Sequence, residues 1–317
     1  MTGRFAPSPS GDLHVGNLRT ALAAWLSARA AGERFLVRMD DLDPSVSVDR
    51  HGQRQLDDLA AVGVDWDGTI VRQRDRFTRY HEVTDELTAL GLTYPCFCSR
   101  REIREAVRAP HDASPDGAYP GTCRDLSDAE IARRSETRPP ALRLRTDGAS
   151  RAVDDEVAGT FVGTADDFVI RRNDGVPAYN LAVVLDDWDQ GVTQVVRGDD
   201  LLSSTPRHLL LQELLDAPTP RYAHVPLVLG PDGDRLSKRD GAVTLADLAE
   251  RDVAPSAVRH ALLRSLGIPT GAGDAEAAID AWRAGRRNPG RHPLTTVTLD
   301  ELEREWSPSP DAQGRAR

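Results

Sequence analysis

The sequence predicts an α/β fold built on a parallel sheet, and two observations support this prediction. Strand-like runs at 2–6 (TGRFA) and 34–41 (RFLVRMDD) flank a long Ala/Leu-rich helix, which makes a strand–helix–strand unit. Beyond this unit, strand-like and helical patterns keep alternating along the chain. Strands that alternate with helices pair in parallel and carry the helices on the faces of the sheet, so we expect the α/β class.

The remaining elements are read from apolar spacing and from start and stop residues. A helix at 204–215 is the best marked, with Ser204 or Thr205 as its cap and Pro206 in its first turn. The other expected elements are helices at 48–63 and 79–91, strands at 167–172, 191–197 and 224–230, and helical segments after about residue 245.

Two segments differ from this pattern. Residues 94 to about 151 contain all the cysteines and several Pro/Gly/Asp-rich turns, and we interpret them as an insertion with a small fold of its own. From about Asn288 the chain is rich in Pro, Arg and Asp, which predicts a loosely ordered tail. The predicted units are the first half of the sheet domain (1–93), the insertion (94–175), the second half of the sheet domain (176–245), a helical region (246–287) and the tail (288–317).

Composition limits the class of protein. The chain has 317 residues, 39% hydrophobic and 28% charged, which is typical of a soluble globular protein of about two domains. Its formal net charge of −10 excludes a general nucleic-acid coat but leaves room for a local contact with one RNA end. We expect a cytoplasmic protein without a membrane partner, because no apolar run approaches a membrane span and the N-terminus lacks a signal-peptide pattern.

The stretch PSPSGDLHVGN (7–17) leads from the first strand into the first helix. A tight turn before a helix N-terminus is a ready anion site, because backbone N–H groups and the helix dipole converge there. His14 can donate to phosphate oxygens, and Gly16 lets a flat base lie close to the backbone. Taken alone, the stretch favours the ordinary alternative, in which Asp12 caps the helix and His14 is incidental.

A second stretch, RLSKRDGAV (235–243), contains the only lysine of the chain. Lysine and arginine total 40, so 39 of these residues are arginines and Lys238 stands alone. A compact, mobile ammonium beside Ser237, on a loop with Gly and Asp neighbours, can close on a polyphosphate. The alternative is a solvated charged turn.

Together, the two stretches resemble the two signatures of class I aminoacyl-tRNA synthetases. Further segments are similar to the glutamyl branch of that family, in its order: 4–11 (RFAPSPSG), 38–44 (RMDDLDP), 177–215 and 235–241 (RLSKRDG). The resemblance extends from residue 1 to about 265. It implies a Rossmann-like class I catalytic domain with an inserted, zinc-containing subdomain that binds an RNA end, and a short helical C-terminal region that contacts the RNA stem.

The resemblance implies a two-step reaction. An amino-acid carboxylate attacks the α-phosphate of ATP to give an aminoacyl-adenylate and pyrophosphate, and the acyl group then passes to an RNA hydroxyl. His14 and Lys238 are the implied catalytic residues, which steady the phosphates together with nucleotide-bound Mg²⁺. The residues implied to bind ATP are Pro7, Gly11, His14, Gly16, Asn17, Ser237 and Lys238.

Charge points to glutamate as the amino acid. Its side-chain carboxylate calls for a bidentate arginine, and Arg4 and Arg197 lie at positions that match the family. Its ammonium group calls for a carboxylate partner, and Asp40 occupies the position where the family usually has the longer Glu. The alternative for each residue is a surface or strand-end salt bridge. The residues implied to bind glutamate are Arg4, Ala6, Ser8, Asp40, Tyr179 and Arg197.

The insertion predicts a metal site. Its three cysteines suit Zn²⁺, which takes four ligands in a closed structural site. His111 is one candidate for the fourth ligand, but Tyr119 occupies that place in the short relatives that this chain resembles. The alternative is three reduced cysteines without a metal. We expect one structural zinc ion per chain, held by Cys96, Cys98, Tyr119 and Cys123.

The length of the chain after residue 265 indicates which members of the glutamyl branch the chain resembles most. A full-length glutamyl-tRNA synthetase continues into a large helical anticodon-binding region, whereas about 50 residues remain here. The chain is more similar to the short glutamyl-queuosine tRNA(Asp) synthetases, and Val183 agrees, because the full-length branch is expected to have Asn there. That family activates glutamate without tRNA and attaches it to the queuosine base in the anticodon loop of tRNA(Asp).

The expected partners are therefore ATP, L-glutamate and the anticodon stem-loop of tRNA(Asp), bound by a monomer. Two alternatives stay open: a truncated discriminating glutamyl-tRNA synthetase that charges a 3′ end, and a catalytically idle RNA-binding module derived from a synthetase. A nucleotidyltransferase fits less well, because its motif usually ends in His where this chain has Asn17. Candidates for a basic RNA groove, or else for a solvated helix face, are Arg100, Arg101, Arg104 and Arg108.

Overall fold

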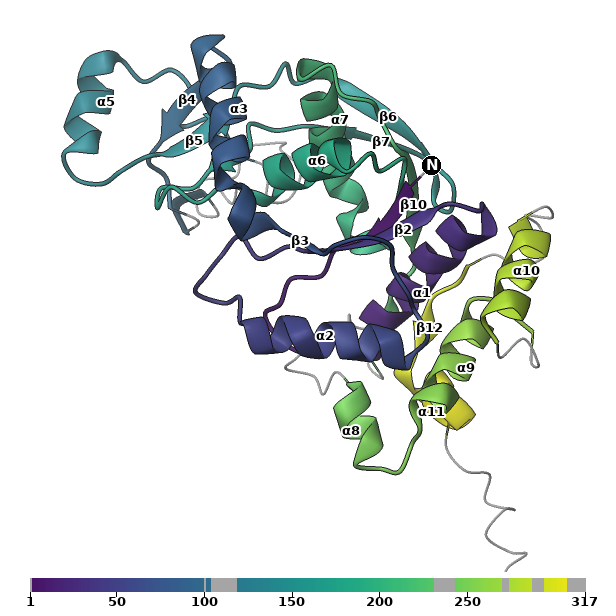
Figure 1. Ribbon diagram of the computed structural model, residues 1–317. Coiled ribbons are helices and arrows are strands. Elements are labelled where there is room, and N and C mark those ends of the chain that lie inside the picture. Colours follow the sequence, from purple (N-terminus) through teal and green to yellow (C-terminus); the bar gives the residue numbers. More distant parts are fainter. Residues whose placement is uncertain are drawn as a thin grey trace, which may run out of the picture.

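A parallel sheet of five strands, in the order β10–β9–β1–β2–β3, lies at the centre of the molecule (Figure 1). The computed structural model describes residues 2–99, 101–103, 119–230, 243–269, 274–286 and 294–306. Every pairing in this sheet is parallel, which confirms the predicted α/β class. Its strands are β1 (Thr2–Phe5), β2 (Arg34–Met39), β3 (Val71–Arg72), β9 (Gln194–Gly198) and β10 (Arg221–Val225).

Helices connect these strands. The helices expected at 48–63, 79–91 and 204–215 are α2, α3 and α7, with ends shifted by a few residues, whereas apolar spacing did not predict α6. The helices are α1 (Val15–Ala30), α2 (Asp49–Ala61), α3 (Phe77–Ala89), α5 (Asp128–Ser135), α6 (Tyr179–Asp189), α7 (Thr205–Leu214), α8 (Leu245–Ala249), α9 (Pro255–Ser265), α10 (Ala275–Arg286) and α11 (Leu299–Trp306), with short 3-10 helices η1 (Gln73–Arg76) and η2 (Asp199–Ser204).

The two faces of the parallel sheet differ in chemistry, because side chains alternate along each strand. One face is apolar, and Phe5, Val37 and Val196 pack there in one core with α1, α9 and α10. Helix α1 approaches β1 closely because Gly3 has no side chain: a Cβ there would lie 3.0 Å from the Cβ of Ala28. The opposite face lies toward α6 and α7 and carries polar side chains: Arg4, Arg38, Arg197 and His224.

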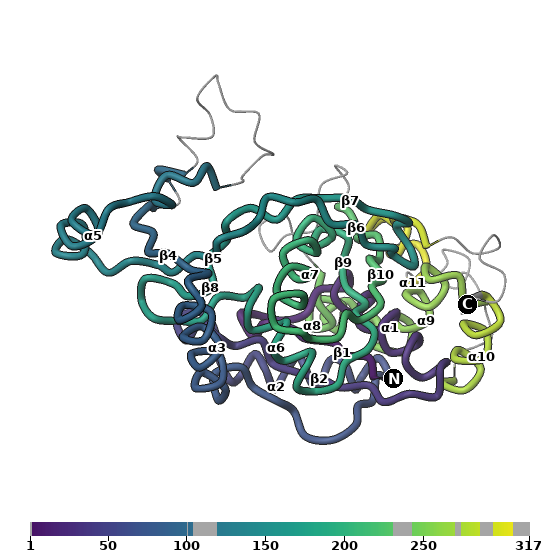
Figure 2. Tube along the Cα trace, turned by 90° about the horizontal axis from the view of Figure 1, so that it is seen from above, coloured from purple at the N-terminus to yellow at the C-terminus, as the bar shows by residue number. Residues whose placement is uncertain are grey.

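The insertion forms two small antiparallel sheets. One contains β4 (Thr93–Cys96), β5 (Ala141–Leu144) and β8 (Val169–Arg171), and the other is the hairpin of β6 (Ser150–Asp155) and β7 (Gly159–Thr164). Figure 2 shows α5, β4 and β5 at one end of the molecule, whereas the β6–β7 hairpin returns over α7 and β10. The inserted part of the chain therefore reaches back to the parallel sheet.

The strand expected at 224–230 is divided in two. β10 ends at Val225, and β11 (Val228–Leu229) pairs in parallel with β12 (Val297–Thr298). Pro226 lies between them and has no backbone N–H, so it cannot donate a ladder hydrogen bond at the point where the strand is interrupted.

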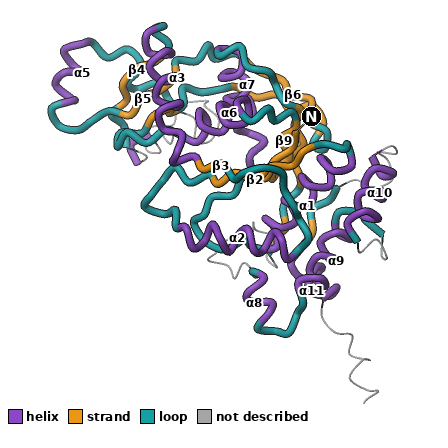
Figure 3. Tube along the Cα trace, in the orientation of Figure 1, coloured by secondary structure: helices purple, strands orange, loops and turns teal. Residues whose placement is uncertain are grey.

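The loosely ordered tail expected from Asn288 is wrong over residues 294–306. Helix α11 lies there and buries Leu299, Leu302 and Trp306, which join the core around α1 and α9. These three residues have the spacing of a helix face, but the surrounding Pro, Arg and Asp residues mask it in the composition. Helices α9, α10 and α11 gather at the end of the molecule opposite α5 (Figure 3). Within the described ranges, no helix combines the length and the apolar character needed to cross a membrane.

Candidate active site

A cavity of about 700 Å³ lies where the strand order reverses, between β1 and β9. In open α/β sheets, ligands bind outside the carboxyl ends of the strands at such a point. The structure brings eleven of the predicted site residues together on the wall of this cavity, whereas Ser237 and Lys238 lie outside the described residues. The eleven are Arg4, Ala6, Pro7, Ser8, Gly11, His14, Gly16, Asn17, Asp40, Tyr179 and Arg197.

His14 caps helix α1. Its Nδ1 accepts from the backbone N–H of Asn17 at 3.3 Å, and the Asn17 Oδ1 accepts from the backbone N–H of His14 at 3.2 Å. The alternative in which Asp12 caps the helix is wrong, because Asp12 instead pairs with His51 and Arg54. An Nδ1 that accepts leaves the ring proton on Nε2, so the neutral His14 side chain has an Nε2–H donor at the edge of an anion-binding helix terminus.

Gly16 has a structural role that the sequence did not predict, whereas the expected close approach of a base stays a prediction. A Cβ at Gly16 would lie 3.0 Å from both Cε1 and Nδ1 of His14, and 3.5 Å from the Cβ of Val228. A side chain would therefore push the imidazole out of its capping position. A glycine at position 16 therefore leaves the space that the His14 imidazole occupies when it caps α1.

Arg4 is buried and keeps donors for a ligand. Its Nε and Nη2 donate to Asp187 at 3.2 and 3.4 Å, and its Nη1 donates to the Val196 carbonyl at 3.1 Å. A guanidinium has five N–H donors. One N–H on each terminal nitrogen is therefore without an acceptor among the described residues, and these two donors remain for a ligand carboxylate.

Asp40 lies in a network of opposite charges. Arg38 donates to Asp40 at 2.8 Å and to Asp187 at 2.7 Å, and both carboxylates are buried. Burial raises the pKa of Asp40 to about 6, against the opposing effect of Arg38. Burial also opposes ionisation of Asp187, but Arg4 and Arg38 outweigh it and lower the pKa of that carboxyl. Asp40 therefore titrates within reach of physiological pH, whereas Asp187 stays ionised.

Arg197 has only uncharged partners. Its Nε donates to His224 Nε2 at 3.0 Å, its Nη1 lies 3.2 Å from His208 Nδ1, and its Nη2 donates to Leu201 O and to Thr205 Oγ1. Among the described residues, no carboxylate lies within ion-pair distance of this guanidinium. A buried cation without an anionic partner suits a ligand carboxylate. Tyr179 stands beside it, with its ring centre 6.1 Å from that of His208.

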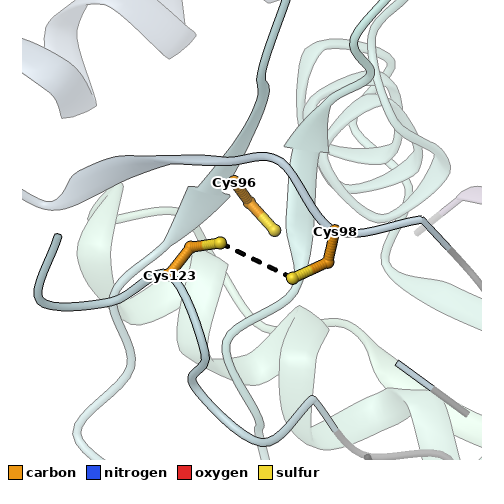
Figure 4. A group of neighbouring side chains, drawn as sticks. All are labelled: Cys96, Cys98 and Cys123. Carbon is orange, nitrogen blue, oxygen red and sulfur yellow. Dashed lines mark hydrogen bonds between the residues drawn. The ribbon is translucent and has the colours of Figure 1, made fainter. Parts of the chain in front are cut away.

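The three cysteines form a compact cluster at the edge of the small antiparallel sheet. The Sγ atoms of Cys96, Cys98 and Cys123 all lie within 4.8 Å of one another and converge on one point (Figure 4). The Tyr119 hydroxyl lies 3.4 Å from Cys96 Sγ and 3.7 Å from Cys98 Sγ. Three thiols and a phenol oxygen are therefore close enough together to share a metal ion, and the donor set fits zinc. His111 lies outside the described residues.

Several residues around the cavity were missed by sequence reasoning. Gln55 of α2 donates to the carbonyls of Ser8 at 3.0 Å and Gly11 at 2.6 Å, and so fixes the loop that leads to His14. Asp187 and His208 hold the two arginines. No pattern in the sequence marks Gln55, whereas Asp187 and His208 belong to the segment that resembles the family, and that resemblance was a signal for them.

Comparison with known proteins agrees with this geometry. Residues 1–279 match the family described as "tRNA synthetases class I (E and Q), catalytic domain". The chain is 59% identical over 271 residues to a glutamyl-Q tRNA(Asp) synthetase of Nocardia farcinica. The aligned residues cover 84% of this chain and 85% of that protein. It is 45% identical to the protein of the same name from Geobacter sulfurreducens, over 94% of this chain and 95% of that protein.

Longer relatives match over part of their length. A glutamate–tRNA ligase 1 of Acidithiobacillus ferrooxidans is 40% identical over 82% of this chain and 56% of that protein. A crystal structure of a glutamate tRNA ligase from Elizabethkingia meningosepticum, in complex with its amino acid, superposes with a TM-score of 0.76 at 25% identity, over 96% of this chain and 68% of that one. The chain therefore belongs to the class I aminoacyl-tRNA synthetases of the glutamyl and glutaminyl branch, in the family of the glutamyl-Q tRNA(Asp) synthetases.

Proposed function

We propose that this chain activates L-glutamate with ATP in the absence of tRNA and then transfers it to the queuosine base in the anticodon loop of tRNA(Asp). One observation carries the proposal of the substrate. The cavity that begins at the His14 helix terminus also contains a buried Arg197 without a carboxylate partner among the described residues, and an Arg4 with two donors left. The names of the relatives that match over most of their length support the proposed acceptor.

The first step needs the two reactants in line. The α-carboxylate oxygen of glutamate attacks the α-phosphorus of ATP, the bond to the bridging oxygen breaks, and pyrophosphate leaves. Arg4, Arg197 and Tyr179 would bind the side-chain carboxylate and orient the amino acid, and Asp40 would pair with its ammonium. The His14 Nε2–H and the Lys238 ammonium would stabilise the charge that develops on the phosphates. Mg²⁺ bound with ATP would neutralise phosphate charge.

The second step transfers the acyl group. A hydroxyl of the modified base attacks the carbonyl carbon of glutamyl-adenylate, AMP leaves, and the hydroxyl proton is released. The insertion is the part that we propose to hold the RNA, with one structural zinc ion bound by Cys96, Cys98, Tyr119 and Cys123. Of the arginines considered for a basic groove, Arg101 is exposed, and Arg100, Arg104 and Arg108 lie outside the described residues. The active form is proposed to be a monomer.

Exchange of pyrophosphate into ATP tests the first step. We expect exchange with glutamate alone from a panel of amino acids, with Mg²⁺ and without tRNA. No exchange in well-folded protein would refute activation and favour an idle RNA-binding module. Exchange that requires tRNA would refute the tRNA independence.

Transfer to RNA tests the second step. We expect alkali-labile glutamate on tRNA(Asp) that contains queuosine and none on tRNA(Asp) with unmodified guanosine at that position. Glutamate attached at a tRNA 3′ end, whether or not queuosine is present, would refute the proposed acceptor and favour a truncated glutamyl-tRNA synthetase.

A further inference from the structure

Among the described residues, Arg197 has a single donor left for a ligand. Of its five N–H groups, four meet protein acceptors: His224, His208, Leu201 O and Thr205 Oγ1. The remaining N–H is on Nη1. The direction of that one bond depends on how firmly the other four contacts fix the plane of the guanidinium.

His224 can accept from Arg197 only as one of its two neutral tautomers. Its Nε2 must be unprotonated to accept from the Arg197 Nε–H at 3.0 Å, so the ring proton must be on Nδ1. The Asp155 carboxylate fixes this tautomer, because Oδ2 lies 2.6 Å from Nδ1. Burial lowers the pKa of His224, so the ring is neutral near pH 7. The carboxylate of Asp155 therefore contacts the imidazole of His224, which in turn contacts the guanidinium of Arg197.

Asp155 is itself held rigidly. It is 6% exposed and accepts from the backbone N–H groups of Val157 at 2.9 Å, Ala158 at 2.8 Å and His224 at 3.0 Å. These donors, together with the His224 ring, outweigh burial and hold the pKa of Asp155 well below its usual range. The carboxylate is therefore a fixed negative charge behind His224.

The position of Asp155 in the chain connects two parts of the molecule. Arg197 and His224 are direct neighbours in the parallel sheet, in the register of β9 and β10. Asp155 ends β6 and belongs to the β6–β7 hairpin, the segment of the insertion that returns to the sheet. The insertion thus contributes a charged group behind the cavity without lining it.

We propose that Asp155 and His224 are positioning residues that hold Arg197 in the orientation needed to select the side-chain carboxylate of the amino acid. The inference rests on the proposed function, since it assigns that carboxylate to Arg197. The negative charge of Asp155, placed behind the His224 imidazole, balances the buried guanidinium of Arg197 and leaves the last N–H of Nη1 without a protein acceptor among the described residues. A carboxylate in direct contact with Arg197 would compete with the substrate for that donor.

The test compares two neighbouring carboxylates of one hairpin. Asp155→Asn keeps the shape but removes the charge and lets an amide N–H face the imidazole. Asp154→Asn is the matched control, because Asp154 is exposed and accepts from the Thr160 hydroxyl across the hairpin. We expect Asp155→Asn to raise the KM for glutamate in pyrophosphate exchange about 10- to 100-fold, as for a lost hydrogen bond to a charged group. The KM for ATP and the kcat should change less than about threefold.

A double-mutant cycle separates positioning from mere structural support. In His224→Gln the side-chain oxygen can accept from the Arg197 Nε–H without help from Asp155. In that background, Asp155→Asn should raise the KM for glutamate less than about threefold further, so the two effects are not additive. Discrimination between glutamate and glutamine should fall in Asp155→Asn.

Three results would overturn the inference: an unchanged KM for glutamate in folded Asp155→Asn, additive effects in the cycle, or an equal loss in kcat and in both KM values together with a lower Tm. A wild-type chain without any glutamate-dependent exchange refutes the proposed function instead, and so is distinguished from these results.

Discussion

His14 has two roles in this structure, and two substitutions separate them. It caps α1 through Nδ1, and its Nε2–H lies at the proposed ATP site. Asparagine is among the best N-cap residues but cannot place a donor where the imidazole Nε2 lies. Alanine supplies neither. We therefore compare His14→Asn with His14→Ala.

The magnitudes are set by the two contacts. Loss of an N-cap costs about 1 kcal/mol, so His14→Ala should lower the free energy of unfolding by that amount and the Tm by a few degrees, whereas His14→Asn should not. Removal of one donor to a developing phosphate charge costs about 10²–10³ in kcat, and we expect this loss in both variants.

Thermal unfolding and glutamate-dependent pyrophosphate exchange are the two measurements. If His14→Asn exchanged pyrophosphate within about threefold of wild type, the reasoning for the Nε2–H donor would be refuted. An unchanged Tm in His14→Ala would refute the reasoning for the cap.

Four further predictions concern the proposed active site and the cysteine cluster. Lys238→Ala should reduce exchange by about 10²-fold or more while leaving the Tm unchanged, and unaffected exchange would contradict the proposed role of that loop. Because burial raises the pKa of Asp40 to about 6, its carboxylate is lost as the pH falls through that value. The KM for glutamate should then rise about tenfold per unit below the pKa of Asp40, and Asp40→Asn should abolish this rise and show a high KM at every pH. Metal analysis of the purified protein should find about one zinc per chain, with a marked loss in Cys123→Ala. Arg143→Met keeps the proposed ligands but removes a guanidinium 3.6 Å from the ring centre of Tyr119, so zinc affinity measured by chelator competition should fall about tenfold, and an unchanged affinity would contradict a role for Arg143.

The sequence predicted the parallel sheet and the grouping of Arg4, His14 and Arg197, because strand–helix alternation and the order of the motifs depend on local patterns. It could not predict what holds these side chains. Asp187 of α6 contacts Arg4, and His208 of α7 contacts Arg197. Asp155 of the β6–β7 hairpin contacts His224, which in turn contacts Arg197. No spacing in the chain relates these three segments to β1 or β9. The sequence also could not predict His14 rather than Asp12 as the cap, because aspartate is a preferred N-cap residue and histidine is not.

Helix α11 and strand β12 were missed for a related reason. Their apolar residues are few and become informative only through the partners that the fold supplies: Leu302 and Trp306 of α11 join the core that the parallel sheet forms with α1, α9 and α10. The buried Arg19 of α1 donates to the carbonyl of Ser265, at the end of α9, at 3.1 Å and to the carbonyl of Thr295, just before β12, at 2.9 Å. These two hydrogen bonds connect α1 with α9 and with the segment that leads into β12. Three buried side chains are enough to attach α11 to the core, so a segment of mostly polar composition can still be ordered.

The pairing of β11 with β12 affects how the molecule is made. Synthesis on the ribosome proceeds from the N-terminus, so α1 and β11 emerge before β12 and α11. Until then, the part of the core that packs against Leu299, Leu302 and Trp306 stays open to water, and β11 lacks the strand that pairs with it in the folded chain. The core that contains α1 and α9 is therefore complete only after the residues up to Trp306 have left the exit tunnel.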